Sequence, residues 1–362
     1  MPPLSSCGTF RPMSPLTIVH VSSFPFGLRP AFQHSVGVKL SNGLIRNGHL
    51  VLNFSDRDIA RARSILGSRK FGTRPANTAL IEFCTFHRPE IILLGHADVI
   101  LPATLARIRD ILPAIRIAQY NVDPLFEPNN IARLTSKFSV VDASFVTTAG
   151  PAMRALRAGG HLVAFMANPM DTSIERGRCD LVDNLPFDLF YACGNPGRPL
   201  RHICGRDWNM DDFIGALRTK LPHTRVLLGG VGGEPHLTGA AYQTALETAA
   251  MGLNISRRPD SYLYSSDRIA QMIGNGQVVL MERTTGYGDI FSDGEMVFFA
   301  SPDELAAQIT RLATDHTRRR AIATAGRARY HELFNEQAVA AGLLAVLLNE
   351  GDPDAIPGLR TR

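Results

Sequence analysis

The sequence predicts an α/β protein built from two doubly wound, Rossmann-like domains, each with a central parallel sheet. The chain has 362 residues, which is long for one hydrophobic core and favours two domains of roughly 150 to 200 residues. Short runs of β-branched and apolar residues alternate with segments of helical periodicity, as expected for successive βαβ units. The alternation breaks at ANPMD, residues 167–171, and then restarts. This break is the predicted hinge between the domains, because Pro and Asn favour turns.

The composition is that of an ordinary globular protein. Hydrophobic residues make up 45% of the chain and charged residues 20%, and no apolar run approaches the roughly 20 residues that a membrane-spanning helix needs. Residues 1–15 lack the basic and then apolar order of a signal peptide. We therefore expect a disordered lead segment and a cytoplasmic protein.

The cysteines and the net charge argue against several classes of function. The five cysteines are scattered and have no C-x-x-C spacing, which disfavours both a disulfide framework and a zinc site. The net charge of +5 favours anionic partners in general. No basic stripe with interleaved aromatic residues is present, so we expect no nucleic-acid partner.

The N-terminal domain is predicted to span residues 16–170. Its first strand, LTIVHVS at 16–22, leads through a Gly/Pro loop into a helix and a second strand, which completes one βαβ unit. Residues 66–78 contain Gly, Pro and basic residues and are predicted to form a surface loop. The other strands are predicted at 50–54, 90–95, 115–119, 143–147 and 162–165, and the helices at 36–46, 56–65, 101–112, 130–137 and 152–158.

The C-terminal domain is predicted to span residues 171–335. Its first strand, FDLFYACG at 187–194, is followed by a predicted loop, NPGRPLRHICGRD. A final helix at 336–350 is apolar on most sides and is expected to pack across both domains, and 351–362 is expected to be a disordered tail. The remaining strands are predicted at 225–228, 252–256, 278–281 and 295–299, with helices at 211–219, 240–250, 268–273, 301–312 and 317–330.

The clearest functional signal is YLYSSDRIAQMIGNGQVVLME, residues 262–282. It predicts a polar loop, a short helix and a buried strand. Ser265 or Ser266 is a natural N-cap for the helix, and Asp267 suits the positive end of the helix dipole. A polar loop that feeds a helix N-terminus within an α/β alternation predicts an anion-binding site.

Three segments in order resemble a known enzyme family. RIAQMIGNG with VVLM (268–281), DIFSDGEMVFFASPDEL (289–305) and IATAGRARYHELF (322–334) resemble the donor-binding half of the CgeB-like (spore maturation protein) glycosyltransferases. In that family, R-x-F-E-A-x-A-C-G precedes an apolar strand, and an L-F-x-x-G-x-E segment, a D-E-L helix and an A-x-x-G-x-x-R helix follow. The resemblance covers 252–334.

The resemblance implies a GT-B fold, in which two Rossmann-like domains face each other across a cleft. It also implies a glycosyltransferase that moves a sugar from a nucleotide-diphosphate donor of UDP or GDP type to a glycan or lipid-linked acceptor. The family context is surface polysaccharide or glycoconjugate synthesis, with no cofactor besides the donor. A catalytically silent sugar-nucleotide binding module and a nucleotide-sugar epimerase remain as alternatives.

Gln271 departs from the family pattern. The family has a glutamate at this position, and in GT-B enzymes such a glutamate commonly accepts hydrogen bonds from the donor ribose. Gln271 and Arg268 are three residues apart and share a helix face that does not carry the apolar side chains. An amide oxygen can still accept a hydrogen bond, but without the strength that a charged carboxylate adds. This departure keeps the silent binding module open.

The diphosphate of a sugar nucleotide needs cationic or N–H partners. We expect these from the backbone of 265–267 and from Arg268, or from an arginine of the 194–201 loop. Arg268 could instead pair with Glu295. The predicted donor-binding residues are Gly194, Arg198, Gly230, Arg257, Tyr264, Ser265, Ser266, Asp267, Arg268 and Gln271.

An inverting glycosyltransferase also needs a base for the acceptor hydroxyl. His34 lies in the first loop, Asp123 lies at a strand exit, and His96 follows the third strand, where open α/β sheets bind ligands. These three residues are the candidate catalytic bases. A retaining enzyme would need none of them.

Two further polar clusters have simpler explanations. The D-x-D of 56–58 has the spacing of a metal–diphosphate site, but the acidic first turn of a helix explains it better. The arginines of 318–320 could contact an anionic membrane that carries the acceptor, but a solvated helix face is the simpler interpretation. We therefore expect no metal site and at most a peripheral membrane contact.

Overall fold

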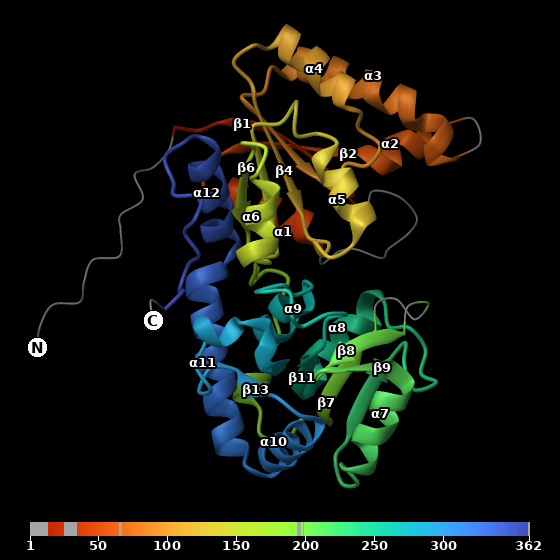
Figure 1. Ribbon diagram of the computed structural model, residues 1–362, viewed down its shortest axis with the longest axis vertical. Helices are drawn as coiled ribbons and strands as arrows, with labels where there is room; N and C mark the ends of the chain where they lie inside the picture. The colour runs from red at the N-terminus through yellow and green to blue at the C-terminus, as the bar shows by residue number, and fades with distance from the viewer. Residues whose placement is uncertain (1–13, 25–34, 65–66, 194–196, 198, 361–362) are drawn as a thin grey trace, which may run out of the picture.

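The computed structural model consists of two α/β lobes, and it describes residues 14–24, 35–64, 67–193, 197 and 199–360. Figure 1 shows the N-terminal lobe, in red to yellow, above the C-terminal lobe, in green to blue. Both large sheets are parallel throughout. The predicted fold class of two doubly wound domains is therefore confirmed. No helix in the described part of the chain is long and apolar enough to span a membrane.

The N-terminal lobe contains a six-stranded sheet in the order β2-β1-β3-β4-β5-β6. Its strands are β1 (Thr17–Ser22), β2 (Leu50–Ser55), β3 (Ile91–Gly95), β4 (Arg116–Asn121), β5 (Ala143–Val146) and β6 (Leu162–Phe165). Its helices are α1 (Val36–Arg46), α2 (Asp56–Ala62), α3 (Arg69–His87), α4 (Pro102–Ile111), α5 (Pro128–Thr135) and α6 (Gly150–Leu156). The apolar run of β3 is buried along its whole length, as expected for a central parallel strand covered on both faces.

The C-terminal lobe contains a five-stranded sheet in the order β10-β7-β11-β12-β13. Its strands are β7 (Phe187–Ala192), β10 (Val226–Gly229), β11 (Ala249–Asn254), β12 (Val278–Glu282) and β13 (Val297–Phe299). Its helices are α7 (Met210–Thr219), α8 (Gly239–Thr248), α9 (Arg268–Gly274), α10 (Pro302–Thr314) and α11 (His316–Phe334), with short 3₁₀ turns η1 (Cys179–Leu181), η2 (Arg283–Thr285) and η3 (Tyr287–Asp289). Ser301 Oγ caps α10 by accepting from Glu304 N–H at 3.1 Å, as expected for a Ser-x-x-Glu capping box.

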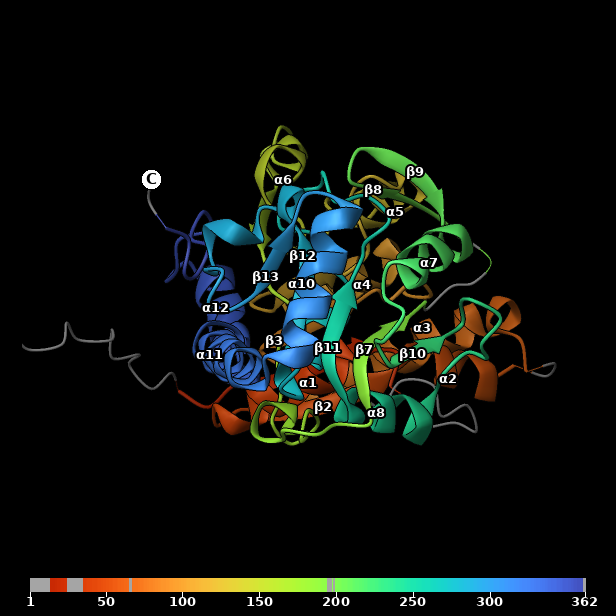
Figure 2. The same cartoon turned by 90° about the horizontal axis from the view of Figure 1, so that it is seen from below.

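The segments that follow β6 and α11 both pass between the lobes, and they lie side by side. Met170 N–H donates to Phe334 O, and Glu336 N–H donates to Met170 O, both at 2.9 Å. The last helix, α12 (Glu336–Leu347), then packs on α1 of the N-terminal lobe. Gly43 permits this contact, because a Cβ there would lie 2.0 Å from the Glu336 carbonyl oxygen. Figures 1 and 2 place α11 and α12 along one side of the molecule, away from α7 and α8.

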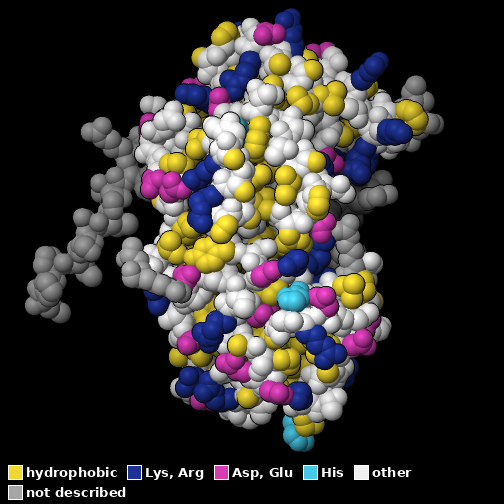
Figure 3. Space-filling model, viewed as in Figure 1, with side chains coloured by type: hydrophobic (Ala, Val, Ile, Leu, Met, Phe, Trp, Pro, Cys, Tyr) yellow, Lys and Arg dark blue, Asp and Glu magenta, His cyan; other side chains and the backbone are white. Residues whose placement is uncertain are grey.

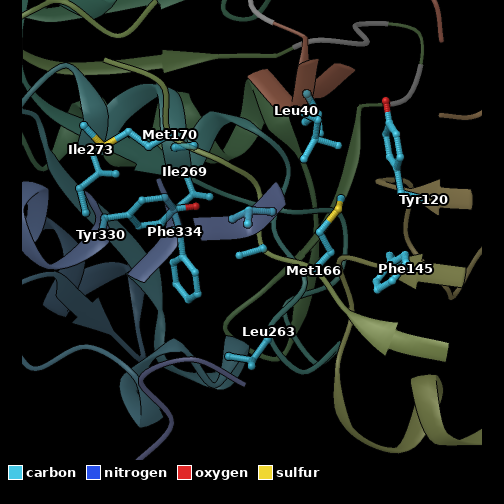
Figure 4. Packing of buried hydrophobic residues seen from close by; sticks show 14 of the residues in the cluster. Leu40, Tyr120, Phe145, Met166, Met170, Leu263, Ile269, Ile273, Tyr330 and Phe334 are labelled. Atoms are coloured by element: carbon cyan, nitrogen blue, oxygen red, sulfur yellow. The ribbon is translucent and has the colours of Figure 1, made fainter. Parts of the chain in front are cut away.

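One hydrophobic cluster is shared by both lobes. It joins Tyr120 and Phe145 of the N-terminal sheet through Met166 and Met170 of the segment that follows β6 to Phe334 at the end of α11. In Figure 4, Met166 lies between Tyr120 and Phe145 on one side and Met170 and Phe334 on the other. In Figure 3, hydrophobic side chains also gather on the surface between the two lobes. The shared apolar core fixes one lobe against the other, because close-packed interiors resist deformation.

The predicted surface loop at 66–78 is wrong, because α3 runs through most of it. Pro75 lies within the helix, where the sequence pattern favours a break. Gly72 lies at a close helix contact, since a Cβ there would be 1.6 Å from the carbonyl oxygen of Ala60 on α2. Packing against α2 therefore explains the glycine that the sequence alone assigns to a loop.

The loop predicted after the first strand of the C-terminal domain is also wrong in part. It contains an antiparallel hairpin, β8 (Leu200–Ile203) with β9 (Arg206–Asn209). Cys204 and Gly205 form its turn with φ of 50° and 77°, which is typical of a two-residue hairpin loop. Cysteine is uncommon at positive φ, so the sequence pattern does not predict this turn.

Two terminal predictions have different outcomes. Residues 351–360 do not form a free tail, since Asp354 pairs with Arg157 and Arg360 N–H donates to Asp289 O at 3.0 Å. The predicted disordered lead lies outside the described residues apart from residues 14 and 15.

The solvated face predicted for 318–320 is wrong at Arg319, which is buried and donates to Val182 O at 2.7 Å.

Candidate active site between the lobes

Both sheets reverse their strand order at one point, and these points define the site. In the N-terminal sheet, β2 and β3 lie on opposite sides of β1, and in the C-terminal sheet, β10 and β11 lie on opposite sides of β7. Doubly wound sheets bind ligands in the crevice outside the carboxyl ends of the strands at such a switch point. The strand pairs β1/β3 and β7/β11 therefore mark the expected binding positions.

A cavity of about 680 Å³ lies between the lobes at these positions. Residues at the carboxyl ends of all four strands line it: Ser22 and Ser23 for β1, Gly95 and His96 for β3, Ala192 and Cys193 for β7, and Ile255 and Ser256 for β11. The two switch points thus open onto one shared space. Its volume is in the range of small-molecule sites, about 300–1,000 Å³.

Arg268 joins the two strand ends of the C-terminal switch point. Its Nη1 donates to Ala192 O and its Nη2 donates to Ile255 O, both at 2.7 Å. Its Nε has no hydrogen-bond partner in the described chain. The alternative pairing with Glu295 is wrong, because Glu295 accepts from Ser292 N–H at 2.8 Å instead. The guanidinium is therefore fixed at the cavity wall, where it places a positive charge.

Gln271 also lines the cavity, and its amide belongs to a polar network. Its Oε1 accepts from Tyr242 OH at 2.7 Å, and its Nε2 donates to Asp267 Oδ2 at 2.9 Å. An amide suits this position because it can accept from a hydroxyl and donate to a carboxylate at the same time. A glutamate would place a second carboxylate against Asp267.

A buried lysine connects this network to the opposite lobe. Lys39 of α1 is fully buried, and its Nζ lies 2.7 Å from Glu175 Oε1 and 3.1 Å from Asp267 Oδ1. Burial alone would lower the pKa of Lys39, but the two carboxylates raise it above its ordinary value. The ammonium is therefore charged in the folded protein and holds the start of α9 against α1.

Arg201, His236, Thr238 and Tyr242 line the cavity but are not named in the predicted list of site residues. Arg201 does fall within the 194–201 loop, from which the sequence predicts an arginine, and it is buried beside Cys193. Thr238 is the N-cap of α8, but its side chain makes no capping hydrogen bond. The first-turn N–H groups of this ten-residue helix therefore start at the cavity without a side-chain acceptor, which favours an anion there.

Tyr264 and Arg257 form a cavity wall that contacts the N-terminal lobe. The Tyr264 ring packs edge-on against Phe126, with 5.8 Å between the ring centroids. Arg257 lies over the same Phe126 ring and pairs with Glu127 at the start of α5. Burial raises the pKa of Tyr264 to about 12, so it is a neutral hydrogen-bonding group.

His96 and Asp123 lie together on the N-terminal side of the cavity. Nδ1 of His96 lies 3.8 Å from Oδ2 of Asp123. His96 has a left-handed backbone, with φ of 57°, and such strain is commonly found at functional sites. Burial lowers the pKa of His96 below its ordinary value, although the Asp123 carboxylate acts in the opposite direction. A neutral imidazole beside a carboxylate can accept a proton from a hydroxyl group.

The other predicted site residues have mixed positions. Ser266 lines the cavity, whereas Ser265 is buried and its Oγ accepts from Asn254 Nδ2 at 2.8 Å. The predicted serine N-cap is wrong, because Asp267 holds that position and no side chain caps α9. Gly230 lies outside the cavity lining and packs near Cys193, where a Cβ would be 2.8 Å from the carbonyl oxygen.

Three predicted residues, His34, Gly194 and Arg198, lie outside the described residues. Among the residues that are described, no three His, Cys, Asp or Glu side chains gather into a cluster that could hold a metal. Asp56 and Asp58 form the acidic first turn of α2. This is the simpler interpretation that the sequence favours for the D-x-D.

Solved structures share the arrangement of the two lobes. HepE from Anabaena, in complex with UDP and glucose, has a TM-score of 0.55 and 13% identity over 92% of this chain and 100% of that chain. The fold is GT-B. A UDP-forming α,α-trehalose-phosphate synthase from Burkholderia xenovorans has a TM-score of 0.57 and 10% identity over 93% of this chain and 99% of that chain.

A putative UDP-N-acetylglucosamine 2-epimerase from Listeria monocytogenes is similar as well, with a TM-score of 0.51 and 14% identity over 95% of this chain and 100% of that chain. At such low identities the likeness concerns the GT-B fold alone. The comparison with curated proteins finds no match.

Residues 201–345 match the model of the glycosyl transferase-like family. The matched segment contains α8 and α9. It also contains every residue of the C-terminal lobe that lines the cavity, except Ala192 and Cys193, which precede it. The predicted enzyme class, a glycosyltransferase, is confirmed by this match. His96 and Asp123 lie across the cavity from α8 and α9 of the matched segment.

Proposed function

We propose that this protein transfers a sugar from a UDP- or GDP-sugar to a glycan or lipid-linked acceptor, without a metal ion. The observation that carries this proposal is the single cavity onto which both topological switch points open. The resemblance to CgeB-like enzymes places the reaction in surface polysaccharide or glycoconjugate synthesis. In that setting the protein works in the cytoplasm, at most peripheral to the inner membrane.

The donor is proposed to bind on the C-terminal side of the cavity. Arg201, Arg268 and the N-terminus of α8 all lie there, and these groups suit a diphosphate. They would stabilise the charge that develops on the departing nucleoside diphosphate, a role that a metal ion fills in other enzymes. Gln271 is proposed to contact the ribose through the Oε1 lone pair that Tyr242 leaves free.

The acceptor is proposed to bind on the N-terminal side, with His96 as the base of an inverting reaction. The acceptor oxygen forms the new bond to the anomeric carbon, and its proton passes to the imidazole of His96. The bond from the anomeric carbon to the diphosphate oxygen breaks, and its electron pair leaves with the nucleoside diphosphate. Asp123 would stabilise the resulting imidazolium at its 3.8 Å distance.

A thermal-shift screen against UDP-, GDP-, TDP- and CMP-sugars tests donor binding, since a ligand that binds the folded state raises the melting temperature. We expect a nucleoside-diphosphate sugar to stabilise the protein, and the Arg201→Ala and Arg268→Ala variants to lose this stabilisation. Arg258→Ala is the matched control, because Arg258 is exposed and pairs with Asp260 outside the cavity lining. A protein that no sugar nucleotide stabilises would contradict the proposal.

The same preparation separates the two alternatives in a turnover assay. A silent binding module would bind the donor and release no nucleoside diphosphate with any acceptor. An epimerase, the class of one structural neighbour, would convert the donor sugar with no acceptor present. We expect acceptor-dependent release of nucleoside diphosphate instead.

A further inference from the structure

A second, smaller cavity lies within the N-terminal lobe, behind His96. Its volume is about 210 Å³, below the roughly 300 Å³ at which sites for larger ligands begin. It shares Arg57, His96, Tyr120 and Asp123 with the main cavity, so the two spaces adjoin. A group bound there would lie next to the proposed base.

The charged side chains of this smaller cavity are three cations, Arg57, Arg133 and Lys137, and two carboxylates, Asp98 and Asp123, besides His96. Both carboxylates already have arginine partners. Asp98 accepts from Arg57 Nη2 at 2.8 Å, and Asp123 Oδ2 lies 3.4 Å from Arg133 Nη2. Lys137, the third cation, pairs with neither of these two carboxylates.

Lys137 is a buried lysine that lines the cavity. Its side chain is 6% exposed, and within the described residues its Nζ makes neither a hydrogen bond nor an ion pair. Its backbone carbonyl accepts from Val140 N–H at 2.9 Å and from Val141 N–H at 3.1 Å, which fixes the residue in a turn after α5. A lysine as buried as this one, with no protein partner for its ammonium in the described chain, is costly unless a ligand pairs with it, so its position beside a polar cavity favours a bound anion there.

Burial lowers the pKa of Lys137, and the charges of Asp98 and the buried Asp56 offset this in part. Asp56 is a weak counter-ion, because burial raises its own pKa to about 6. The positive charge in the cavity is therefore incompletely balanced by the protein.

We propose that this cavity is the acceptor subsite, that the acceptor sugar carries a carboxylate or phosphate group, and that the Lys137 ammonium pairs with this anion. The proposal rests on the proposed function for the identity of the bound group as an acceptor. If Lys137 pairs with the anionic group of the acceptor, the hydroxyl groups of the same sugar would lie near His96, since both residues line the same small cavity. The diphosphate of the donor would remain at the arginines of the opposite lobe.

Binding of matched anionic and neutral sugars tests the proposal. The probes are hexose 6-phosphates, hexuronic acids and the neutral parent hexoses in gluco, galacto and manno forms, titrated into the full-length protein by calorimetry with UDP present. We expect at least one anionic sugar to bind and its neutral parent to bind at least about tenfold more weakly, as loss of a charge-assisted hydrogen bond predicts. The phosphate and uronate series show which anion is preferred.

Lys137→Met and Lys137→Arg form the variant pair. The methionine removes the charge from a buried position, and replacing a buried charge by an apolar side chain is often tolerated in folding. We expect Lys137→Met to lose the preference for the anionic sugar and Lys137→Arg to retain most of it, with unchanged UDP binding in both.

The subsite is contradicted if no anionic sugar binds the wild-type protein, or if Lys137→Met binds it as tightly. Failure of the proposed function gives a different result, namely no binding of UDP or any sugar nucleotide while the anionic sugar still binds.

Discussion

The ammonium of Lys39, on α1 of the N-terminal lobe, lies 3.1 Å from Oδ1 of Asp267, the residue before α9 in the C-terminal lobe. Asp267 Oδ2 accepts from Gln271 Nε2, so one carboxylate connects the interlobe ion pair to the side chain that departs from the family pattern. The departure at Gln271 therefore has a structural reason. A carboxylate at 271 would lie against the Asp267 carboxylate instead of donating a hydrogen bond to it.

Gln271→Glu should lower the stability of the protein at pH 8 and have less effect at pH 5. The variant replaces the amide donor to Asp267 by a second carboxylate, which we expect to cost about 1–3 kcal/mol. At lower pH one of the two carboxyls binds a proton and donates again. Thermal unfolding at both pH values measures the difference. The Asp267→Asn/Gln271→Glu double variant exchanges the amide and the carboxylate, and it should be more stable than Gln271→Glu alone. If Gln271→Glu lost the same stability at pH 8 and at pH 5, the explanation would be refuted.

Lys39→Met should destabilise the protein by about 3–5 kcal/mol, because it leaves Glu175 and Asp267 as neighbouring carboxylates without their buried cation. Adding Glu175→Gln should recover part of this loss, since one of the two charges is removed. Melting temperatures of the single and double variants provide the measurement. A single variant as stable as wild type would show that the ion pair adds nothing to the folded state.

The pH dependence of transfer should report His96 if it is the base. Burial lowers the pKa of His96, and Asp123 partly offsets this shift. A protonated imidazole cannot act as a base, so kcat/KM should fall as the pH drops below ~6.5, the ordinary pKa of histidine. This fall is the acid limb of the pH profile. Asp123→Asn removes the raising charge and should move this limb to lower pH. His96→Gln should reduce kcat/KM by about 10² to 10⁴ and abolish the limb. A limb that keeps its position in Asp123→Asn would exclude the pair from this role.

His20 should make the protein less stable in acid. It is fully buried, with Nδ1 2.8 Å from Ser41 Oγ and Nε2 3.1 Å from Tyr120 OH, and burial lowers its pKa to about 3. The unfolded chain binds a proton below pH ~6.5 and the folded chain does not, so the stabilising contribution is present above that pH and is lost as the pH falls toward 3.

This histidine should account for about 2 kcal/mol of stability lost between pH 7 and pH 5. Chemical unfolding of wild type and His20→Asn at both pH values isolates its contribution, because the other histidines are common to both proteins. The variant should show the smaller pH dependence. An unchanged pH dependence would mean that His20 is protonated in the folded protein.

Gly43→Ala should separate α12 from α1. A Cβ at this position would lie 2.0 Å from the Glu336 carbonyl oxygen, and such overpacking costs about 1–3 kcal/mol. Gly342→Ala in α12 is the control, since a Cβ there meets no atom within 4 Å. It should stabilise the helix by about 0.5–1 kcal/mol. Equal melting temperatures for the two variants would contradict the close approach of the helices.

The sequence by itself determined the two parallel sheets of the fold. The runs at 91–94 and 278–281 are apolar and buried along their whole length, as expected for central parallel strands covered on both faces. Arg268 and Gln271 lie within one short stretch of sequence, so the sequence could single out both residues, and both line the cavity. Local patterns failed at Gly72 and Cys204, where contacts with distant backbone or an uncommon φ override residue preference.

The tertiary structure alone decided which polar groups meet. His96 and Asp123 follow neighbouring strands β3 and β4, and only the sheet order brings them within 3.8 Å. Lys39 and Asp267 are 228 residues apart, and Lys137 has no sequence feature that marks it as facing a cavity. Strand order and lobe packing depend on contacts between residues remote in the chain, so periodicity could predict the elements but not the site that they form.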